Sequence, residues 1–207
     1  MSEIEYFYSA QSSYAYLGSA RFRSICAQAG RRIVHRPIDL DEVVPGAGSS
    51  AFSQRSDAFR TYFFNREVQR WSEFRQVPIK GRPTYHHHDV TLANCMLIAA
   101  TEQALDVDAL THAVMEAHWR YDADLADRET LHRVAESAGY DAVALLDAAT
   151  LTPAHNTYAV NNAQAIERSV FGSPTYFLDG DMFYGQDRLE LLERALTTPF
   201  RRAWSGE

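Results

Sequence analysis

The sequence predicts an α/β fold in which a small sheet is interrupted by a long all-helical segment. Three observations carry this prediction: a strand–helix–strand opening, a long middle with helical periodicity, and a closing pair of strands followed by a helix. The 207 residues are enough for a sizeable core and for about one to two domains.

The opening strand is predicted at Ile4–Tyr8, which is a run of aromatic and β-branched residues. The serines that follow break this run, and either Ser12 or Ser13 is a natural helix N-cap. Helical spacing of apolar residues then extends from Tyr14 to about Ala29, and a second strand follows at Arg32–Arg36. This β-α-β unit implies parallel pairing with a right-handed crossover.

The middle of the chain is predicted to be mainly helical. Residues 38–52 are expected to be irregular because they are rich in glycine, serine and proline. The predicted helices are Ser56 to about Phe74, Thr91–Leu105, Asp108–Tyr121, Asp127–Ala138, Asp141–Ala149 and Pro153–Arg168, the last four beginning with a capping residue or an N1 proline. The aromatic residues of the first helix are expected to lie mostly in the core, with one or two lining an apolar cleft: Phe59, Tyr62, Phe63, Phe64, Trp71 and Phe74.

The strand period returns near the C-terminus. Thr175–Leu178 and Asp181–Tyr184 form a predicted hairpin around Asp179-Gly180, since Asp-Gly is a strong signal for a two-residue turn. Asp187 is expected to cap a final helix, Arg188–Leu196. This order of elements predicts a thioredoxin-like fold with a large all-α insertion. Residues 1–50 and 170–207 would form the thioredoxin-like domain, and residues 51–169 the helical insertion domain.

Composition and charge disfavour several classes of function. The formal net charge of −7 argues against nucleic-acid binding, which favours a basic face. No stretch approaches the ~18 apolar residues of a membrane span, and the acidic N-terminus leads straight into strand-like sequence, unlike a signal peptide. Cys26 and Cys95 lie far apart without a C-x-x-C or metal-ligand spacing, so we expect buried, inert thiols in a cytoplasmic protein.

The step Ser173-Pro174 stands at the start of an apolar strand. Proline cannot donate a hydrogen bond to a sheet, so it belongs at the first residue of a strand or at an edge. The bond before a proline can adopt the cis form at little cost. If it does so here, Ser173 offers its main-chain N–H and C=O groups to an extended ligand.

Several motifs of this chain together resemble those of the 2-hydroxychromene-2-carboxylate isomerase family. After the first strand these motifs are Ser12–Leu17, Val170–Thr175 and Tyr184–Leu189. The family is related to the kappa-class glutathione transferases and belongs to the DsbA-like branch of the thioredoxin superfamily. The resemblance covers nearly the whole chain, including Arg70-Trp71, Asn94 and Asp141.

The resemblance implies that glutathione is the cofactor and assigns roles to individual residues. Ser12 stands where oxidoreductases carry their first cysteine, and it would hold the thiolate of glutathione. Ser173, before Pro174, would bind the glutathione backbone. The turn before the last helix would bind the γ-glutamyl end, and its residues are Tyr184, Gly185, Gln186 and Asp187.

Elementary electrostatics supports a thiolate at Ser12. The N-terminus of a helix presents unpaired N–H groups and roughly half a positive charge. A hydroxyl from Ser12 could add a hydrogen bond to the sulfur. Together these interactions would lower the pKa of the thiol from about 8.5 toward neutrality.

The implied reaction is the cis–trans isomerisation of a small aromatic keto acid of the benzylidenepyruvate type. The glutathione sulfur adds reversibly to a conjugated double bond, the new single bond rotates, and the sulfur leaves, so glutathione is not consumed. Homologues are typically homodimers. Two alternatives stay open: a kappa-like glutathione transferase that releases the adduct, and a non-redox DsbA-like module that binds peptides.

Less of the sequence indicates how the substrate is bound. The residues after Pro37 read Ile38-Asp39-Leu40-Asp41-Glu42, without the lysine that the isomerases use on the substrate carboxylate, and their acidic side chains disfavour an anionic substrate. Tyr85 and Asn94 are candidate substrate contacts. A metal is not expected at His86–His88, because adjacent histidines point in different directions and tetrahedral zinc needs further ligands. A solvated loop, or one histidine contacting the substrate, is favoured there.

Overall fold

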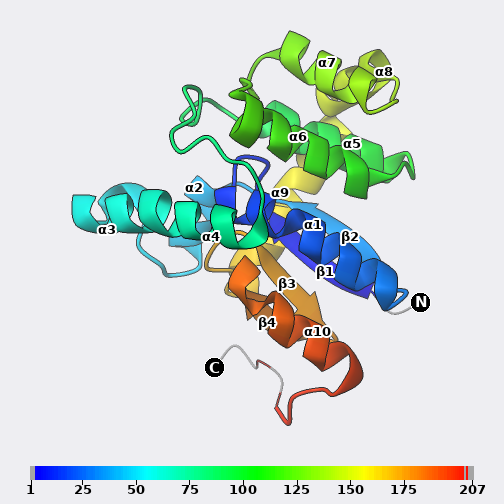
Figure 1. The fold of residues 1–207 in the computed structure, drawn as a ribbon. Helices are drawn as coiled ribbons and strands as arrows, with labels where there is room; N and C mark the ends of the chain where they lie inside the picture. Colours follow the sequence, from blue (N-terminus) through cyan, green and yellow to red (C-terminus); the bar gives the residue numbers. More distant parts are fainter. Residues whose placement is uncertain (1–2, 203, 205–207) are drawn as a thin grey trace.

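The computed structural model describes residues 3–202 and 204, and its sheet joins the two ends of the chain (Figure 1). The strands are β1 (Glu3–Tyr8), β2 (Arg32–Pro37), β3 (Thr175–Leu178) and β4 (Asp181–Tyr184), in the order β2-β1-β3-β4. β1 and β2 are parallel, as the β-α-β pattern predicts, whereas β1–β3 and β3–β4 are antiparallel. The predicted α/β fold class is confirmed.

The helices lie between β1 and β2, in the long middle, and after β4. They are α1 (Ser13–Gln28), α2 (Leu40–Gly46), α3 (Asp57–Thr61), α4 (Val68–Arg75), α5 (Thr91–Glu102), α6 (Val107–Tyr121), α7 (Arg128–Ser137), α8 (Ala142–Ala149), α9 (Thr152–Glu167) and α10 (Leu189–Thr197). A π-helical turn (Tyr62–Glu67) joins α3 to α4, and 3-10 turns lie at Phe52–Gln54 and Gln186–Arg188. In the described part of the chain, no helix has the length and apolar character needed to cross a membrane.

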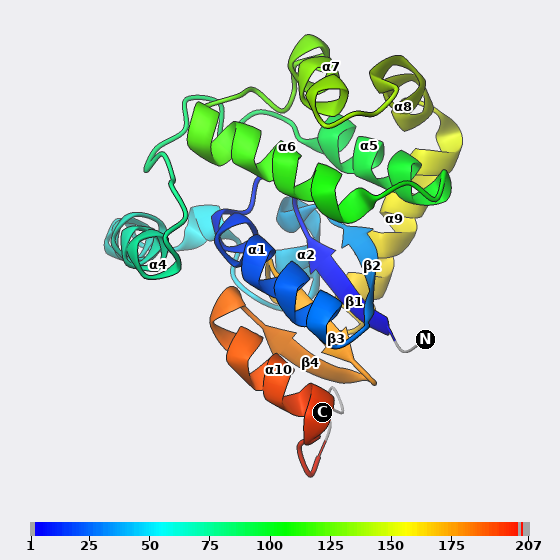
Figure 2. The ribbon, with the colours of Figure 1, turned by 45° about the vertical axis from the view of Figure 1, so that its right-hand side comes forward.

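Side chains of a strand alternate between the two faces of the sheet, and each face carries aromatic rings. On one face, the ring of Tyr6 stacks on Tyr8 and Tyr176 at centroid distances of 4.3 and 5.3 Å. On the other face, Phe7 and Phe177 pack with residues of α2 and α9. Figure 2 shows α1 and α10 side by side on the first face. Helices therefore pack on both faces of the sheet.

The helical block shares its core with the sheet. One apolar cluster runs from β1 and α1 through α5 and α6 to α7 and α8, with fully buried members such as Ile4, Leu97, Leu110 and Leu146. In Figure 1 these helices stack above the sheet, with α5 and α6 nearest to it. The proposed division into a thioredoxin-like domain and a helical insertion stays a prediction.

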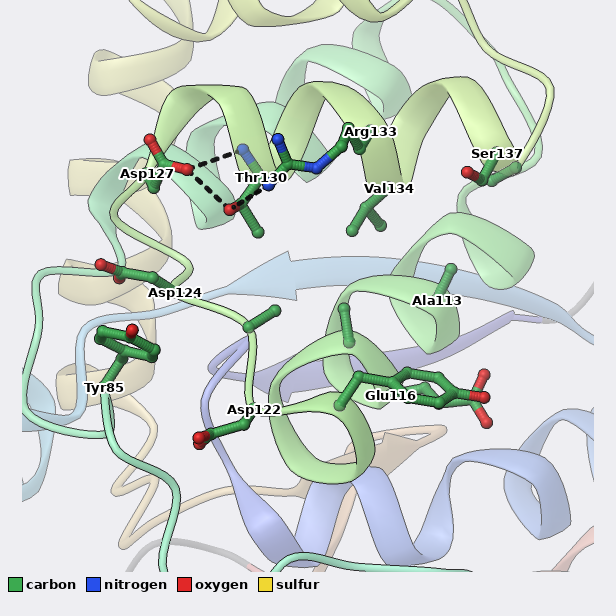
Figure 3. A pocket seen from close by; sticks show the side chains of 14 residues that line it. Tyr85, Ala113, Glu116, Asp122, Asp124, Asp127, Thr130, Arg133, Val134 and Ser137 are labelled. Carbon is green, nitrogen blue, oxygen red and sulfur yellow. Dashed lines mark hydrogen bonds between the residues drawn. The ribbon is translucent and has the colours of Figure 1, made fainter.

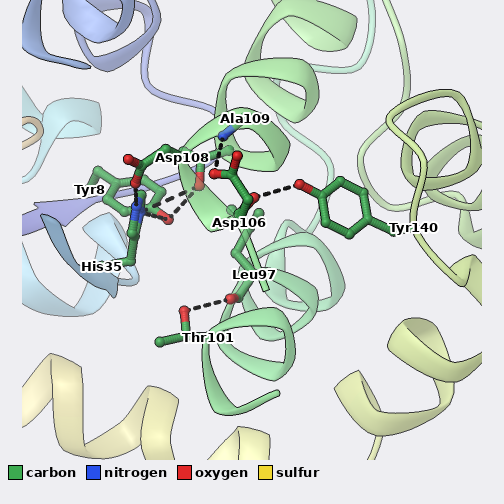
Figure 4. Close-up of polar contacts among 9 residues, drawn as sticks. Tyr8, His35, Leu97, Thr101, Asp106, Asp108, Ala109 and Tyr140 are labelled. Atoms are coloured by element: carbon green, nitrogen blue, oxygen red, sulfur yellow. Dashed lines mark hydrogen bonds and ion pairs between the residues drawn. The ribbon is translucent and has the colours of Figure 1, made fainter. Parts of the chain in front are cut away.

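A buried polar network ties β2 to α6 (Figure 4). His35 Nε2 lies 2.7 Å from Asp108 Oδ1, and His35 Nδ1 lies 3.0 Å from the Tyr8 hydroxyl. The same hydroxyl lies 3.1 Å from Thr111 Oγ1. Asp108 is thus not the cap of α6, contrary to the predicted start of that helix. The helix begins two residues earlier than a cap at Asp108 would allow, and Asp106 caps it by accepting from Ala109 N at 3.3 Å.

Local signals at the turns and caps agree with the structure. Asp179 and Gly180 both have positive φ, 50° and 87°, as the Asp-Gly turn requires. Asp127 and Asp141 cap α7 and α8 through bonds of 3.0 Å. Gln186–Arg188 is different: α10 starts at Leu189 without a side-chain cap, so the prediction that Asp187 caps it was wrong.

Residues 38–52 are less irregular than their composition suggests, because α2 occupies most of the first half. Asp39 caps this helix by accepting from Asp41 N at 2.8 Å. Val43 and Val44 are fully buried, and Val43 packs in the cluster that contains Phe7. Burial of these valines against α9 and the sheet outweighs the loop-forming glycine and proline.

The aromatic residues of α3 and α4 do not lie in the core, contrary to expectation. The continuous helical arm from α3 to α4 lies to one side of the sheet (Figure 1), and only Val68 of α4 is buried. Phe74 is 72% exposed and Tyr62 is 53% exposed. The arm contacts α1 along one side only, so its rings stack mainly on one another, as Phe59 does on Phe63 at 5.2 Å.

Candidate active site

Ser12 lies at the N-terminus of α1 and is 8% exposed. Its Oγ accepts a hydrogen bond from Ala15 N at 3.2 Å, which confirms the expected N-cap. The same hydroxyl donates to the main-chain oxygen of Ser173 at 3.1 Å. These two residues are 161 positions apart in the chain. The fold therefore joins the two halves of the predicted site directly.

The Ser173–Pro174 peptide bond is cis, as expected. The Ser173 hydroxyl accepts from Ser9 N at 3.2 Å, and Pro174 O accepts from Gly185 N at 2.8 Å. Three segments thus meet here: the end of β1 with the start of α1, the residues before β3, and the turn after β4. All of them carry residues that the resemblance assigns to glutathione.

The turn after β4 depends on two glycines. A Cβ at Gly172 would lie 2.8 Å from the Tyr184 hydroxyl, so the tyrosine ring lies directly over that backbone. Gly185 has φ 100° and ψ 147°, a conformation open in practice to glycine alone, and a Cβ there would lie 2.3 Å from Asp187 Oδ1. Asp187 therefore folds back over the turn and keeps an exposed carboxylate.

Gln186 supports the turn from within. It is 1% exposed, so its side chain does not face a ligand in this conformation. Arg75 of α4 donates from Nε to Gln186 Oε1 and from Nη2 to Gln186 O, both at 3.2 Å, and from Nη1 to Glu190 at 2.8 Å. Arg75 is thus the positioning residue that connects the helical arm to the turn.

Two tyrosines border the same space. The Tyr14 hydroxyl donates to Phe63 O at 2.6 Å, and its pKa is raised mainly by burial, with smaller contributions from the charge of Glu67 and from Tyr184 and Asp187. The pKa of Tyr184 is also raised by burial, and the positive charge of Arg55 opposes that rise. Both phenols stay neutral at physiological pH, so they offer hydrogen bonds and an apolar face rather than charge.

Comparison with known proteins agrees with this geometry. Residues 3–197 match the family model described as a DsbA-like thioredoxin domain. The chain belongs to this family. The thioredoxin-like fold predicted from the order of elements is therefore confirmed.

Three curated relatives of this chain share one name. A 2-hydroxychromene-2-carboxylate isomerase from Sphingobium xenophagum is 28% identical over 93% of this chain and 97% of its own length. The isomerase of that name from Pseudomonas sp. (strain C18) is 29% identical over 93% of this chain and 89% of its own length. A solved structure of 2-hydroxychromene-2-carboxylate isomerase superposes with a TM-score of 0.81 at 26% identity, covering 93% of each chain. The resemblance seen in the sequence is thereby confirmed.

The two cysteines of this chain do not lie at the position of Ser12. Cys26 and Cys95 are both buried and unpaired with each other, as predicted. Burial raises the pKa of Cys26 to about 12 and that of Cys95 to about 11. Neither thiol is therefore a nucleophile at neutral pH.

The two predicted substrate contacts lie in different surroundings. Asn94 is fully buried, and its amide accepts from Ala10 N at 3.0 Å and donates to Ile38 O and the Tyr158 hydroxyl. It fixes the segment before Ser12 and presents no atom to a ligand in this conformation, so the prediction of direct contact gives way to a supporting role.

Tyr85 instead lines a groove between α6 and α7 with a volume of about 710 Å³ (Figure 3). The acidic side chains of this groove already have hydrogen-bond or ion-pair partners within the chain. Asp122 accepts from Thr84 N at 2.7 Å and pairs with Lys80, and these contacts lower its pKa to about 2. Asp127 is the cap of α7.

Two of the three adjacent histidines, His86 and His88, have separate hydrogen-bond partners. His86 Nδ1 lies 3.2 Å from His118 Nε2, and His88 Nδ1 lies 2.9 Å from Asp124. Among the residues that the structure describes, no three His, Cys, Asp or Glu side chains converge as a metal site would require. The His86 ring also packs at 5.0 Å from Trp119, whose indole donates to Gln11 O. This loop thereby supports the residue before Ser12.

Two carboxylates of the acidic segment after Pro37 have neutral hydrogen-bond donors as partners. Asp39 is used as the cap of α2, and Glu42 Oε2 accepts from Asn162 Nδ2 of α9 at 2.7 Å. These neutral donors leave the negative charges in place, so the expected repulsion of an anionic substrate stays a prediction.

Three residues near the site were missed in the sequence: Tyr14, Arg55 and Arg75. Tyr14 could have been suspected because it follows Ser12 within the matched motif. The arginines gave no local signal, because Arg75 acts on a turn 111 residues away and Arg55 approaches Tyr184 only through the tertiary fold.

Proposed function

We propose that this protein is a glutathione-dependent isomerase that acts on 2-hydroxychromene-2-carboxylate or a closely related aromatic keto acid. The observation that carries the proposal is the hydrogen bond from Ser12 at the N-terminus of α1 to the main chain of Ser173. This hydrogen bond supports the proposal because relatives of similar length are named 2-hydroxychromene-2-carboxylate isomerase. The chain is accordingly assigned to the isomerases.

The residues around Ser12 fit glutathione. Two buried oxygens beside it, Ser9 Oγ and Gln11 Oε1, have no hydrogen-bond partner among the described residues. Buried polar atoms of this kind are normally satisfied, so they favour a polar ligand in this place. The helix N-terminus adds the positive potential that a thiolate requires.

The Ser12 hydroxyl is proposed to change its acceptor when glutathione binds. It donates to Ser173 O in the present conformation, and a rotation about the Cβ–Oγ bond would turn the proton toward the glutathione sulfur while Oγ still caps α1. The same rotation frees Ser173 O to accept an N–H from the peptide backbone of glutathione. One movement would thus prepare both contacts.

The turn after β4 is proposed to bind the γ-glutamyl end. The carboxylate of Asp187 pairs with Arg188 at the surface and is proposed to accept an ammonium group as well, and Gly185 allows the ligand to approach the backbone closely. Gln186 contributes from beneath by holding the turn, together with Tyr184, whose ring forms one wall.

When bound, glutathione supplies a sulfur nucleophile that adds reversibly to the conjugated double bond and leaves after rotation. The chain's own part is to favour the thiolate, through the helix N-terminus and Ser12, and to orient it. Tyr14 and Phe63 offer an apolar wall for the aromatic ring of the substrate. No charge change is required of either side chain.

The test is turnover of 2-hydroxychromene-2-carboxylate with and without glutathione, followed by product and thiol analysis. We expect the trans isomer of the opened keto acid to form over many turnovers while the glutathione concentration stays constant. Stoichiometric loss of glutathione would identify a kappa-like transferase instead. No binding of glutathione at millimolar concentration would leave the peptide-binding module.

A homodimer and a cytoplasmic location are also proposed, both on the basis of the resemblance. Sedimentation analysis of the purified chain tests the first, and cell fractionation tests the second. A monomer at micromolar concentration would contradict the proposed assembly.

A further inference from the structure

Arg55 is a partly buried cation whose charge is not neutralised within the described part of the molecule. Its guanidinium lies 4.7 Å from the ring centroid of Phe52 and 4.9 Å from that of Phe59. Its hydrogen bond runs to a main-chain oxygen, that of Ser50, at 3.4 Å. Arg60, in the helical arm that follows, is paired with the carboxylate of Asp57. Among the described residues, Arg55 therefore has no carboxylate partner for its positive charge. The two aromatic rings fix the orientation of its guanidinium.

A series of ring contacts connects Arg55 to the start of α1, close to Ser12. Tyr14, two residues after Ser12, packs on Phe63 at 4.8 Å, and Phe63 stacks on Phe59 at 5.2 Å. The Arg55 guanidinium lies over the ring of Phe59.

The same series returns to the site from the other side. The charge of Arg55 acts on the pKa of Tyr184, so the two side chains are within electrostatic reach. The Tyr184 ring lies over Gly172, next to Ser173, which bonds to Ser12. The arm, the start of α1 and the end of β4 thus border the space around Ser12, and Arg55 supplies positive charge on the side of the arm.

We propose that Arg55 binds a carboxylate of the ligand that occupies this space, and that it is the residue that selects acids over neutral analogues. The inference rests on the proposed function, which supplies two carboxylate sources, the keto acid and glutathione. A planar guanidinium held over aromatic rings presents its remaining N–H groups as a fork, which suits a carboxylate. A lysine would offer the charge without that geometry.

The experiment compares binding with turnover in four proteins: wild type, Arg55→Gln, Arg55→Lys and the control Arg60→Gln. The probes for calorimetric titration are benzylidenepyruvate, its methyl ester and glutathione. Because a hydrogen bond to a charged group is lost, we expect Arg55→Gln to bind one of the acids about tenfold to hundredfold more weakly. The ester should bind equally to all four proteins. Arg55→Lys should retain part of the preference, and Arg60→Gln should change nothing.

The source of the carboxylate follows from which acid is affected. Weaker binding of benzylidenepyruvate alone assigns Arg55 to the keto acid, and weaker binding of glutathione alone assigns it to the cofactor. Unchanged binding of both acids by Arg55→Gln overturns the inference, as does a wild type that binds neither. A different result would contradict the proposed function alone. If the wild type prefers the acid through Arg55 but does not isomerise it, the carboxylate site is supported and the isomerase reaction is rejected.

Discussion

At the scale of single residues, Ser12 and Gly185 show how few atoms set the site. The Ser12 hydroxyl serves as cap of α1 and as bond to Ser173, so one side chain joins local and tertiary structure. Gly185 allows a backbone conformation that other residues avoid, and thereby lets Asp187 fold over the turn.

Replacing Gly185 by alanine is predicted to weaken glutathione binding at least tenfold. The added Cβ would clash with Asp187 and would force a strained φ, which costs about 1–3 kcal/mol of stability. Gly139→Ala is the matched control, because Gly139 also has positive φ, 88°, but has nothing within 4 Å of its Cβ position. Calorimetry should show lower stability for both variants and weaker binding for Gly185→Ala alone. Equal binding by the two variants would contradict the role of the turn.

At the scale of elements, the helical arm matters because it holds the turn that precedes α10. Arg75 is nearly buried in this contact and donates to both the side chain and the main chain of Gln186. The arm is otherwise attached along one side, so this arginine couples a partly exposed element to the site.

Arg75→Gln is predicted to lower the free energy of unfolding by about 1–3 kcal/mol, since it leaves buried acceptors on Gln186 without partners. It should also weaken glutathione binding. Arg70→Gln serves as control, because Arg70 lies on the same helix and pairs only at the surface with Glu67 and Tyr62. Urea denaturation and glutathione titration measure the two effects. A loss of stability without any change in binding would show that the arm does not position the site.

The elements that the sequence predicted are those with local signals. The Asp179-Gly180 hairpin follows from two residues that tolerate positive φ, and the cap of α7 follows from Asp127 alone. α2 was missed because its stability comes from burying Val43 in the cluster with Phe177, which lies far along the chain. The exposed arm was misjudged for the same reason, because aromatic content does not reveal which partner a ring meets.

The site itself was predictable in part. The motifs placed Ser12, Ser173 and Asp187 together, and the structure brings the first two into direct contact. The sequence could not show that Asn94 is enclosed by three hydrogen bonds, or that the charge of Arg55 acts on Tyr184. Both facts depend on long-range packing rather than on spacing.

At the scale of the whole molecule, histidines lie where segments that are distant in the chain meet. His35 joins β2 to α6, and His86 bonds to His118 beside Trp119. The pKa of His86 is lowered to about 4 by burial first and then by the neighbouring histidines His118 and His87. Its neutral form therefore belongs to the folded state.

Stability is predicted to fall as the pH drops from about 6.5 to about 4. In that interval the unfolded chain binds a proton at His86 that the folded chain does not. The contribution of His86 to stability is therefore complete above about pH 6.5 and is lost as the pH falls toward about 4. The slope contributed by this residue is up to about 1.4 kcal/mol per pH unit. Urea denaturation of wild type and His86→Gln should show a shallower dependence in the variant, whereas the exposed His155→Gln should follow wild type. Parallel curves for wild type and His86→Gln would refute this account.

The most direct test of the central claim is the thiolate absorbance of bound glutathione as a function of pH in wild type and Ser12→Ala. Because Ser12 is proposed to donate to the sulfur, the variant should titrate at higher pH by about one unit, and it should lose about 0.5–2 kcal/mol of stability with the cap. Asp141→Ala removes the cap of α8 away from the site and should leave the titration unchanged. A Ser12→Ala titration that coincides with wild type would show that Ser12 is a helix cap only.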